Sequence, residues 1–266
     1  MDLFTCFLLL IIGLFAGGYG VIVGAGGGFI FVPALLILFN MTPQIAAGTG
    51  LVIVLLNSLF GTIGYVKQKR IDYKLGLVLT LGAVPGTFLG IQLSRMVSDG
   101  LFHVAFAVML IALGMFLFIK NRPGRTVHGA QFETAAASEP LSRAFPASHK
   151  SFIGLLILGL VLGIISNFFG IGGGWLLVPI LIYLFKVPPH QATATSLFSL
   201  SLYASMGVGL QIFYQHIDWM AVLWGGIGVM LGAQLGVLIS NKLPGNVIIQ
   251  MLSVLLIGVG LNLIVT

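Results

Sequence analysis

Charged residues are scarce in this chain. Its 266 residues include 12 Lys and Arg and 6 Asp and Glu, together 7% of the sequence, whereas an ordinary soluble domain carries about 25%. So few charges cannot cover the surface of a water-soluble protein, and disordered chains are polar and rich in charge. Apolar residues make up 58%. The sequence therefore predicts an all-α membrane protein that crosses the bilayer several times.

Cysteine is almost absent as well. The one cysteine, Cys6, excludes an intramolecular disulfide and a cysteine-rich metal site. The five histidines are scattered, with none at metal-ligand spacing. The motifs GxSxG and HExxH are missing, and no P-loop lysine follows the glycine runs. We therefore expect no enzyme, no cofactor and no metal site.

Acidic residues are missing from the middle of every apolar segment. The six acids lie at segment ends or in a polar stretch: Asp2, Asp72, Asp99, Glu133, Glu139 and Asp218. Carriers of cations usually keep carboxylates within the membrane, because an ion stripped of water needs a compensating charge. The sequence therefore argues against a carboxylate cage for a cation. The net charge of +6 comes from bases in short loops, which indicates topology and not nucleic-acid binding.

The same pattern occurs twice. A shift of 146 positions places the run GAGGGFIFVP, residues 24–33, on GIGGGWLLVP, residues 170–179, and the match continues without a gap. Pro43 falls on Pro189, and Asp72 falls on Asp218. We expect a membrane repeat at residues 1–120, a polar cytoplasmic linker at residues 121–146, and a second membrane repeat at residues 147–266.

Each repeat has about five apolar segments, and the second of each set is short. As a helix, residues 29–39 would rise only about 17 Å, too little for a full span. Short segments interrupted by Gly and Pro at matching places in two halves point to the binding site of a transporter. Whether these segments cross or re-enter stays open. The ten segments are 3–22, 29–39, 46–66, 73–95, 101–119, 151–168, 175–186, 192–214, 219–240 and 247–265.

The basic residues predict the relative orientation of the repeats. If each repeat crosses an odd number of times, Arg95 alone lies outside, and eleven bases lie inside. Four crossings per repeat would move Lys186 and Lys242 outside as well. The positive-inside rule favours the odd number. We expect inverted repeats with both termini outside. The eleven inside bases are Lys67, Lys69, Arg70, Lys74, Lys120, Arg122, Arg125, Arg143, Lys150, Lys186 and Lys242.

The glycine triplets open the two short segments. A helix N-terminus leaves unpaired N–H groups and carries about half a positive charge, and glycine lets an oxyanion approach the backbone. Two such ends could hold one anion the size of sulfite or a sulfonate group. The alternative is that the triplets only permit tight helix packing, as we expect for Gly82, Gly86 and Gly90. The triplets are Gly26, Gly27 and Gly28, and Gly172, Gly173 and Gly174.

Uncharged polar residues within the spans complete the candidate site. A buried amide or hydroxyl in lipid needs a partner, so each of these residues either binds substrate or bonds a neighbouring helix. Asp72 and Asp218 are expected to cap the helices that follow them, and His216 is expected to be structural. The candidate substrate-binding residues are Thr49, Asn57, Asn167, Thr195, Ser196 and Gln211.

These residues resemble a known family. The runs GAGGGFIFVPALLILF and AAGTGLVIVLLNSLFGTIGY, with the second copies GIGGGWLLVPILIYLF and ATATSLFSLSLYASMG, are similar to the sulfite exporter TauE/SafE-like (TSUP) family. The resemblance covers all but the linker. It implies a bacterial inner-membrane carrier that exports sulfite, thiosulfate or organosulfonates, in a family often described with about eight spans. The second copy has Ala194 where the first has Gly48.

We therefore expect a multi-pass transporter whose partners are a small anionic substrate and the lipid bilayer. The substrate would be sulfite, thiosulfate or a C2–C3 organosulfonate such as sulfoacetate. The alternative is a carrier or pore for another small anion or a neutral metabolite, and a membrane enzyme or assembly factor is less favoured. A homodimer stays open.

Overall fold

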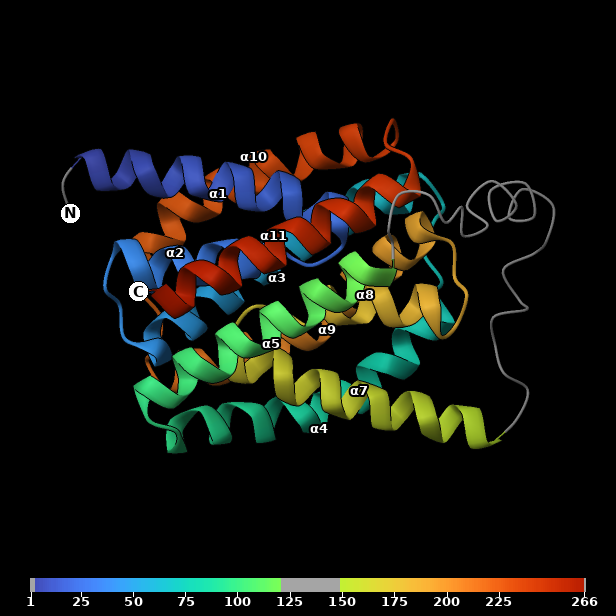
Figure 1. Cartoon of the computed structure of the whole chain (residues 1–266), viewed down its shortest axis with the longest axis horizontal. Coiled ribbons are helices and arrows are strands. Elements are labelled where there is room, and N and C mark those ends of the chain that lie inside the picture. The colour runs from blue at the N-terminus through green and yellow to red at the C-terminus, as the bar shows by residue number, and fades with distance from the viewer. Residues whose placement is uncertain (1–2, 121–148, 266) are drawn as a thin grey trace.

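The computed structural model describes residues 3–120 and 149–265, and every regular element in them is an α-helix (Figure 1). The linker expected at residues 121–146 lies outside the described residues. Seven of the described helices, α1, α3, α4, α5, α7, α9 and α10, are long and apolar enough to cross a membrane, which confirms the expected all-α membrane fold. The helices are α1 Leu3–Val23, α2 Gly28–Leu38, α3 Pro43–Lys67, α4 Tyr73–Met96, α5 Asp99–Lys120, α7 His149–Phe169, α8 Gly174–Tyr183, α9 Pro189–Phe213, α10 Trp219–Ser240 and α11 Gly245–Val265.

Four of the long helices begin at residues suited to a helix start. Pro43 and Pro189 open α3 and α9, where the missing N–H of proline would have no partner in any case. Asp72 and Asp218 precede α4 and α10, and their carboxylates accept the N–H of Leu75 and Ala221 at 3.0 Å each. The expected capping role of both aspartates is therefore confirmed.

Corresponding helices of the two halves run in opposite directions. Both ends of α7 lie 146 positions after those of α1, and the same holds for α9 and α3. In Figure 1, α1 starts at the left, as does α5, whereas α7 and α11 start at the right. The start of α1 and the end of α11 therefore lie at one end of the molecule, opposite the end of α5 and the start of α7.

Glycines set the closest helix contacts. A Cβ on Gly86 or Gly90 would meet the carbonyl oxygen of Leu160 or Ile164 on α7, so the backbones of α4 and α7 are in direct contact. Gly82 packs in the same way, which confirms the packing role expected for these three glycines. The second half repeats the arrangement between α10 and α1, where Gly228 and Gly232 lie against Leu10 and Leu14.

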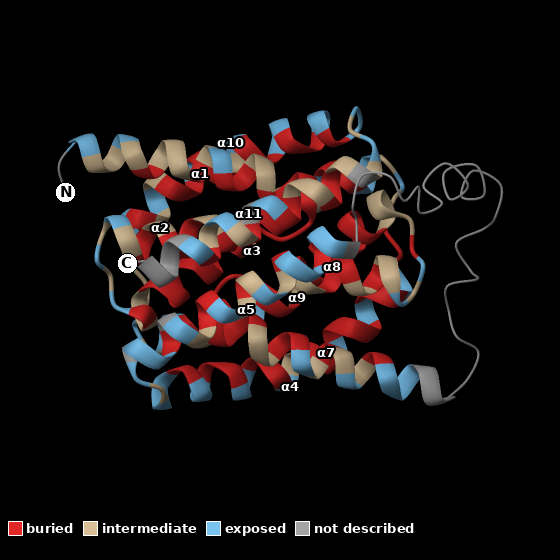
Figure 2. Cartoon of the chain, in the orientation of Figure 1, coloured by how far each residue is buried: buried red, intermediate tan, exposed pale blue. Residues whose placement is uncertain are grey.

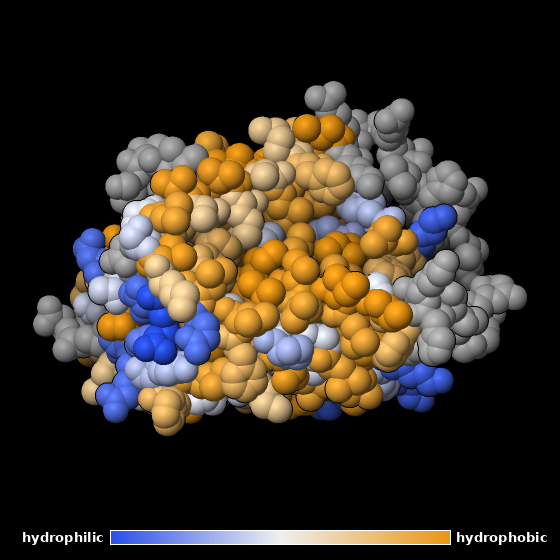
Figure 3. Space-filling view, turned by 90° about the horizontal axis from the view of Figure 1, so that it is seen from below, coloured by the Kyte–Doolittle hydropathy of each residue, from blue (hydrophilic) through white to orange (hydrophobic). Residues whose placement is uncertain are grey.

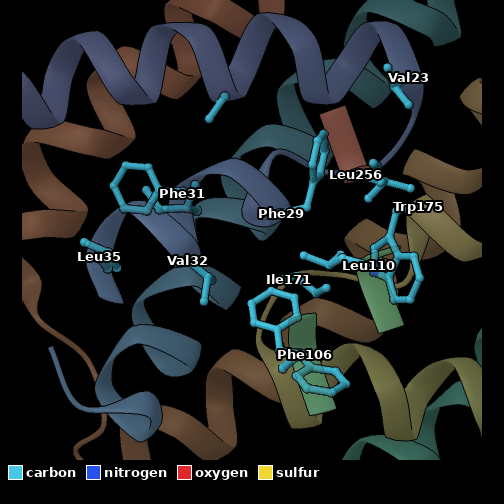
Figure 4. Close-up of a cluster of buried hydrophobic side chains, with 14 of the residues drawn as sticks. Val23, Phe29, Phe31, Val32, Leu35, Phe106, Leu110, Ile171, Trp175 and Leu256 are labelled. Carbon is cyan, nitrogen blue, oxygen red and sulfur yellow. The ribbon is translucent and has the colours of Figure 1, made fainter. Parts of the chain in front are cut away.

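The short helices turn back toward the end from which the chain entered. In Figure 4, Val23 lies at the end of α1, and Phe29, Val32 and Leu35 follow along α2 in the reverse direction. Because α2 returns toward the end where α1 starts, the long helices α3, α4 and α5 follow from that end. The described helices of the first half are therefore compatible with the odd number of crossings that the basic residues favour.

The surface matches a bilayer environment. Apolar residues form a broad band between polar ends (Figure 3), and large side chains such as Phe15, Leu81 and Leu238 are more than 60% exposed. Buried residues lie along the centre of the bundle (Figure 2). Among the bases with described side chains, Arg95 lies in the last turn of α4, at the end of the bundle where α5 starts, which is the left end of Figure 1. The others lie at the right end: Lys67, Lys69, Arg70, Lys74, Lys186 and Lys242.

Candidate functional site

The two glycine loops meet in the middle of the molecule. A Cβ on Gly28 would lie 2.8 Å from Cα of Ile171, and one on Gly174 would lie 2.8 Å from Cα of Ala25. All ten residues of the two loops, 24–28 and 170–174, are buried. The short helices α2 and α8, one from each half, therefore start next to each other in the buried middle of the molecule. Figure 4 shows Phe29, Ile171 and Trp175 close together there.

Two apolar side chains close the remaining sides of the loops. A Cβ on Gly26 would lie 3.0 Å from Val54 Cγ1, and one on Gly172 would lie 2.8 Å from the same atom. Leu200, which corresponds to Val54 in the second half, contacts both glycines as well. Gly26 and Gly172 are thus needed for packing, and side chains at these positions would force the two halves apart.

The ends of α2 and α8 keep unpaired backbone donors. In the described part of the chain, the first backbone bonds of α2 are donated by Ile30 and Phe31 to the carbonyl of Gly27. No described acceptor takes the N–H of Gly28 or Phe29. The equivalent bonds of α8 are donated by Leu176 and Leu177. Both ends present a partial positive charge to the buried centre.

Asn57 of α3 lies at the first of these ends. Its Nδ2 is 2.9 Å from the place of a Cβ on Gly27, and its side chain is fully buried. Neither Nδ2 nor Oδ1 has a hydrogen-bond partner among the described residues. An unpaired carboxamide in an apolar interior is unfavourable by about 1–3 kcal/mol, so Asn57 is the candidate with the strongest need for a ligand.

The second half fills the equivalent place differently. Tyr203 of α9 corresponds to Asn57, and its hydroxyl accepts the N–H of Gly173 at 3.0 Å. Ser166 lies nearby, with Cβ 3.5 Å from the place of a Cβ on Gly173. The sequence analysis did not single out Tyr203 or Ser166. The shift of 146 positions, which pairs Tyr203 with Asn57, was the signal that could have found Tyr203.

Asn167 bonds its own helix and one neighbouring helix. Its Nδ2 donates to Thr87 Oγ1 at 3.0 Å and to the carbonyl of Gly163 at 2.9 Å. Its Oδ1 has no described partner and lies against Gly207 of α9. Asn167 therefore joins α7 to α4 and keeps one free acceptor. Gln211, also on α9, is buried with an unpaired Oε1, and no described contact joins it to the glycine loops.

Thr49, Thr195 and Ser196 have structural partners. The hydroxyls of Thr49 and Thr195 accept the backbone N–H of Asp218 at 2.9 Å and of Asp72 at 3.0 Å. Ser196 donates to the carbonyl of Gly24 at 2.8 Å, so it links α9 to the first glycine loop. Of the uncharged polar candidates, the structure therefore brings Asn57 and Ser196 to the loops, and the substrate-binding role of the whole set stays a prediction.

A basic and aromatic cluster lies where α4 and α9 end. The guanidinium of Arg95 lies 4.4 Å from the ring centroid of Tyr214, which stacks on His216 at 6.0 Å. Burial and the nearby Arg95 charge lower the pKa of His216 from its usual 6.5. His216 lies in the loop after α9. Because its pKa is lowered, its ring is mostly neutral at pH 7, which fits the structural role expected for it.

Comparison with known proteins agrees with this architecture. A family model described as "Sulfite exporter TauE/SafE" matches residues 9–263. The probable membrane transporter protein YunE of Bacillus subtilis is 34% identical, over 97% of this chain and 96% of its own length. YjnA of the same organism, also named a probable membrane transporter, is 29% identical over 96% and 98%.

More distant relatives match along most of the chain. The probable membrane transporter protein MJ0441 of Methanocaldococcus jannaschii is 25% identical, over 96% of this chain and 93% of its own. No solved structure matches the chain. The family match, these relatives and the membrane helices agree that the protein is a multi-pass membrane transporter and not an enzyme, and it belongs to the TauE/SafE sulfite exporter family.

Proposed function

We propose that this transporter exports small sulfur-containing anions across the inner membrane of a bacterial cell. The substrate class is sulfite, thiosulfate or a C2–C3 organosulfonate such as sulfoacetate. The observation that supports this most strongly is the meeting of α2 and α8. Two helix N-termini with unpaired N–H groups begin at one buried centre, and helix N-termini bind oxyanions without a formal positive charge.

The distribution of charge favours an anion over a cation. In the described helices, acids and bases lie at or near the helix ends, so no carboxylate is available to replace the water around a cation. The positive ends of α2 and α8 would repel a cation and attract an anion. The binding set that we propose comprises the two glycine triplets with Asn57 and Ser196. Thr49, Asn167 and Thr195 are left out of this set because each bonds to another helix or to the residue before one, and Gln211 is left out because no described contact joins it to the loops.

The arrangement of the helices suggests how the anion would move. We propose that residues 1–120 and 147–266 are inverted repeats, because corresponding helices run in opposite directions and make equivalent contacts. In transporters built this way, the substrate lies between the repeats near the middle of the membrane, and the halves move against one another. Both glycine loops are buried here, so this conformation is closed toward both ends.

Counterflow in proteoliposomes tests this function. Purified protein is reconstituted, loaded with unlabelled sulfite or sulfoacetate, and diluted into trace labelled substrate. We expect uptake well above that of empty liposomes, and competition by thiosulfate but not by a neutral solute such as glycerol. If no sulfur anion exchanges, or if a neutral solute competes fully, the proposed substrate class is wrong.

A further inference from the structure

We infer that the first half alone holds the anion, at the start of α2 beside Asn57, and that the hydroxyl of Tyr203 takes the place of an anion oxygen in the second half. The inference rests on the proposed function and makes it narrower. It predicts one anion per chain and names the side chain that binds it.

Tyr203 shows how the second half satisfies its own helix end. Its hydroxyl oxygen accepts the N–H of Gly173 at 3.0 Å, and its side chain is 1% exposed. Gly173 and Ser166 both lie beside this hydroxyl. One N–H at the start of α8, that of Gly173, therefore has an internal acceptor, which lies where an oxyanion would otherwise approach.

Asn57 occupies the equivalent position in the first half, but its side chain accepts no described backbone N–H. Its side chain is 0% exposed, and both its amide atoms lack partners among the described residues. Its Nδ2 lies 2.9 Å from the place of a Cβ on Gly27, so the amide points at the start of α2. Buried carboxamides are rarely left without partners, and this one has its Nδ2 directed at the start of α2, where no described side chain accepts the N–H of Gly27 as Tyr203 accepts that of Gly173.

The backbone of the two loops differs at the same point. Gly27 has φ of 76°, a left-handed conformation that suits glycine, whereas Gly173 has φ of −83°. The N–H groups of Gly28 and Phe29 follow Gly27 and have no described acceptor. Together with Nδ2 of Asn57, they form a set of donors from two elements. The helix that they begin, α2, has 11 residues, and its N-terminus carries about half a positive charge.

The chemistry of this set defines the ligand. Every free group except Oδ1 of Asn57 is a donor, so the ligand presents acceptor oxygens and a negative charge, and it is small. Gly20 of α1 lies directly against Nδ2 of Asn57 and the N–H of Gly27. An anion therefore reaches the amide only when α2 moves away from α1, which couples binding to opening of the site.

The test compares Asn57→Leu with Tyr203→Phe, which removes the corresponding polar group of the second half. Thermal melting of the purified protein in detergent is measured without ligand and with sodium sulfite, and KM for labelled sulfite is measured in proteoliposomes. We expect Asn57→Leu to melt at the same temperature as the wild type or higher, since it removes an unpaired buried amide. Its KM should rise about ten- to a hundredfold, and sulfite should no longer stabilise it.

The matched variant should behave in the opposite way. Tyr203→Phe leaves the N–H of Gly173 unpaired, so its melting temperature should fall while its KM stays within about twofold of the wild type. Asn57→Gln should recover part of the affinity that Asn57→Leu loses. The inference is wrong if Asn57→Leu melts at a lower temperature with an unchanged KM, or if Tyr203→Phe raises KM as much as Asn57→Leu does.

The same measurements distinguish a wrong substrate class from a wrong binding site. If the wild type neither transports nor is stabilised by sulfite, thiosulfate or sulfoacetate, the substrate class is wrong. Melting with sodium nitrate and sodium sulfate then tests the site itself. An oxyanion that stabilises the wild type but not Asn57→Leu supports the inference, and the absence of stabilisation by any of these anions overturns it.

Discussion

The hydroxyl oxygen of Thr195 accepts the backbone N–H of Asp72 at 3.0 Å, across 123 positions of sequence. The second half provides the mirror bond, from Asp218 to Thr49 at 2.9 Å. Each bond joins the residue before one long helix to a helix of the opposite half. The two halves are therefore tied to each other at both ends of the bundle, by equivalent groups.

Thr195→Val should destabilise the protein. The substitution keeps the shape of the side chain but leaves a buried N–H without an acceptor, which costs about 1–3 kcal/mol. Thr193→Val is the control, because the hydroxyl of Thr193 bonds only to the carbonyl of Pro189 on its own helix. Melting temperature and sulfite KM should be measured for both variants. A rise in KM for Thr195→Val without a fall in melting temperature would show a substrate role instead.

Gly163→Ala should weaken the contact between α4 and α7. A Cβ at this position would lie 2.9 Å from backbone atoms of Ala83, and overpacking of this kind costs about 1–3 kcal/mol. Gly154→Ala on the same helix is the control, because no atom lies within 4 Å of the place of its Cβ. Thermal melting in detergent should separate the two variants. Equal melting temperatures would mean that the helices are not in backbone contact.

Cysteine labelling should place equivalent loops of the two halves on opposite sides of the membrane. Ser98 follows α4, and Lys242 follows α10. Because α4 and α10 end at opposite ends of the bundle, the two residues lie far apart along the membrane normal. In a background with Cys6 replaced by alanine, a membrane-impermeant maleimide added to whole cells should label Ser98→Cys and not Lys242→Cys. Labelling of both from the same side would exclude inverted repeats.

His216→Gln should leave transport unchanged between pH 7 and 8. Burial and Arg95 lower the pKa of His216 from its usual 6.5 in the folded protein, so the ring is mostly neutral in this range. Because the unfolded chain binds the proton more tightly, wild-type stability should fall as the pH falls below about 6.5. The variant should lose less stability on acidification. If His216→Gln instead removes a response of transport to an imposed pH gradient, the histidine is a coupling residue.

The starts of the long helices and their close contacts can be predicted from the sequence, because both depend on local signals. Aspartates before α4 and α10 and glycines spaced by four are visible in the sequence, and the structure uses both as expected. Prolines at the starts of α3 and α9 are local signals of the same kind. The return of α2 could not be predicted, since a helix of 11 residues can pass on or turn back. Its direction depends on packing against α1 and α3.

The candidate site is predicted less well, because hydrogen-bond partners are distant in sequence. Thr49 and Thr195 look like free hydroxyls within a span, yet each has a backbone partner more than 120 positions away. Tyr203 reads as an apolar core residue, and only the contact with Gly173 shows that its hydroxyl caps a helix. Asn57 is the reverse case, because the structure supplies no partner for an amide that needs one.

Transport of sulfoacetate at a controlled membrane potential tests the central claim, that an uncharged site built from helix ends carries an anion outward. With no ionisable group at the site, we expect facilitated efflux driven by the potential alone. At 100 mV, negative inside, one charge corresponds to about 2.3 kcal/mol, or roughly a fifty-fold gradient. Proteoliposomes loaded with labelled sulfoacetate should therefore release it when valinomycin sets that potential, without a pH or sodium gradient. Release that ignores the potential but follows an imposed proton or sodium gradient would contradict the account.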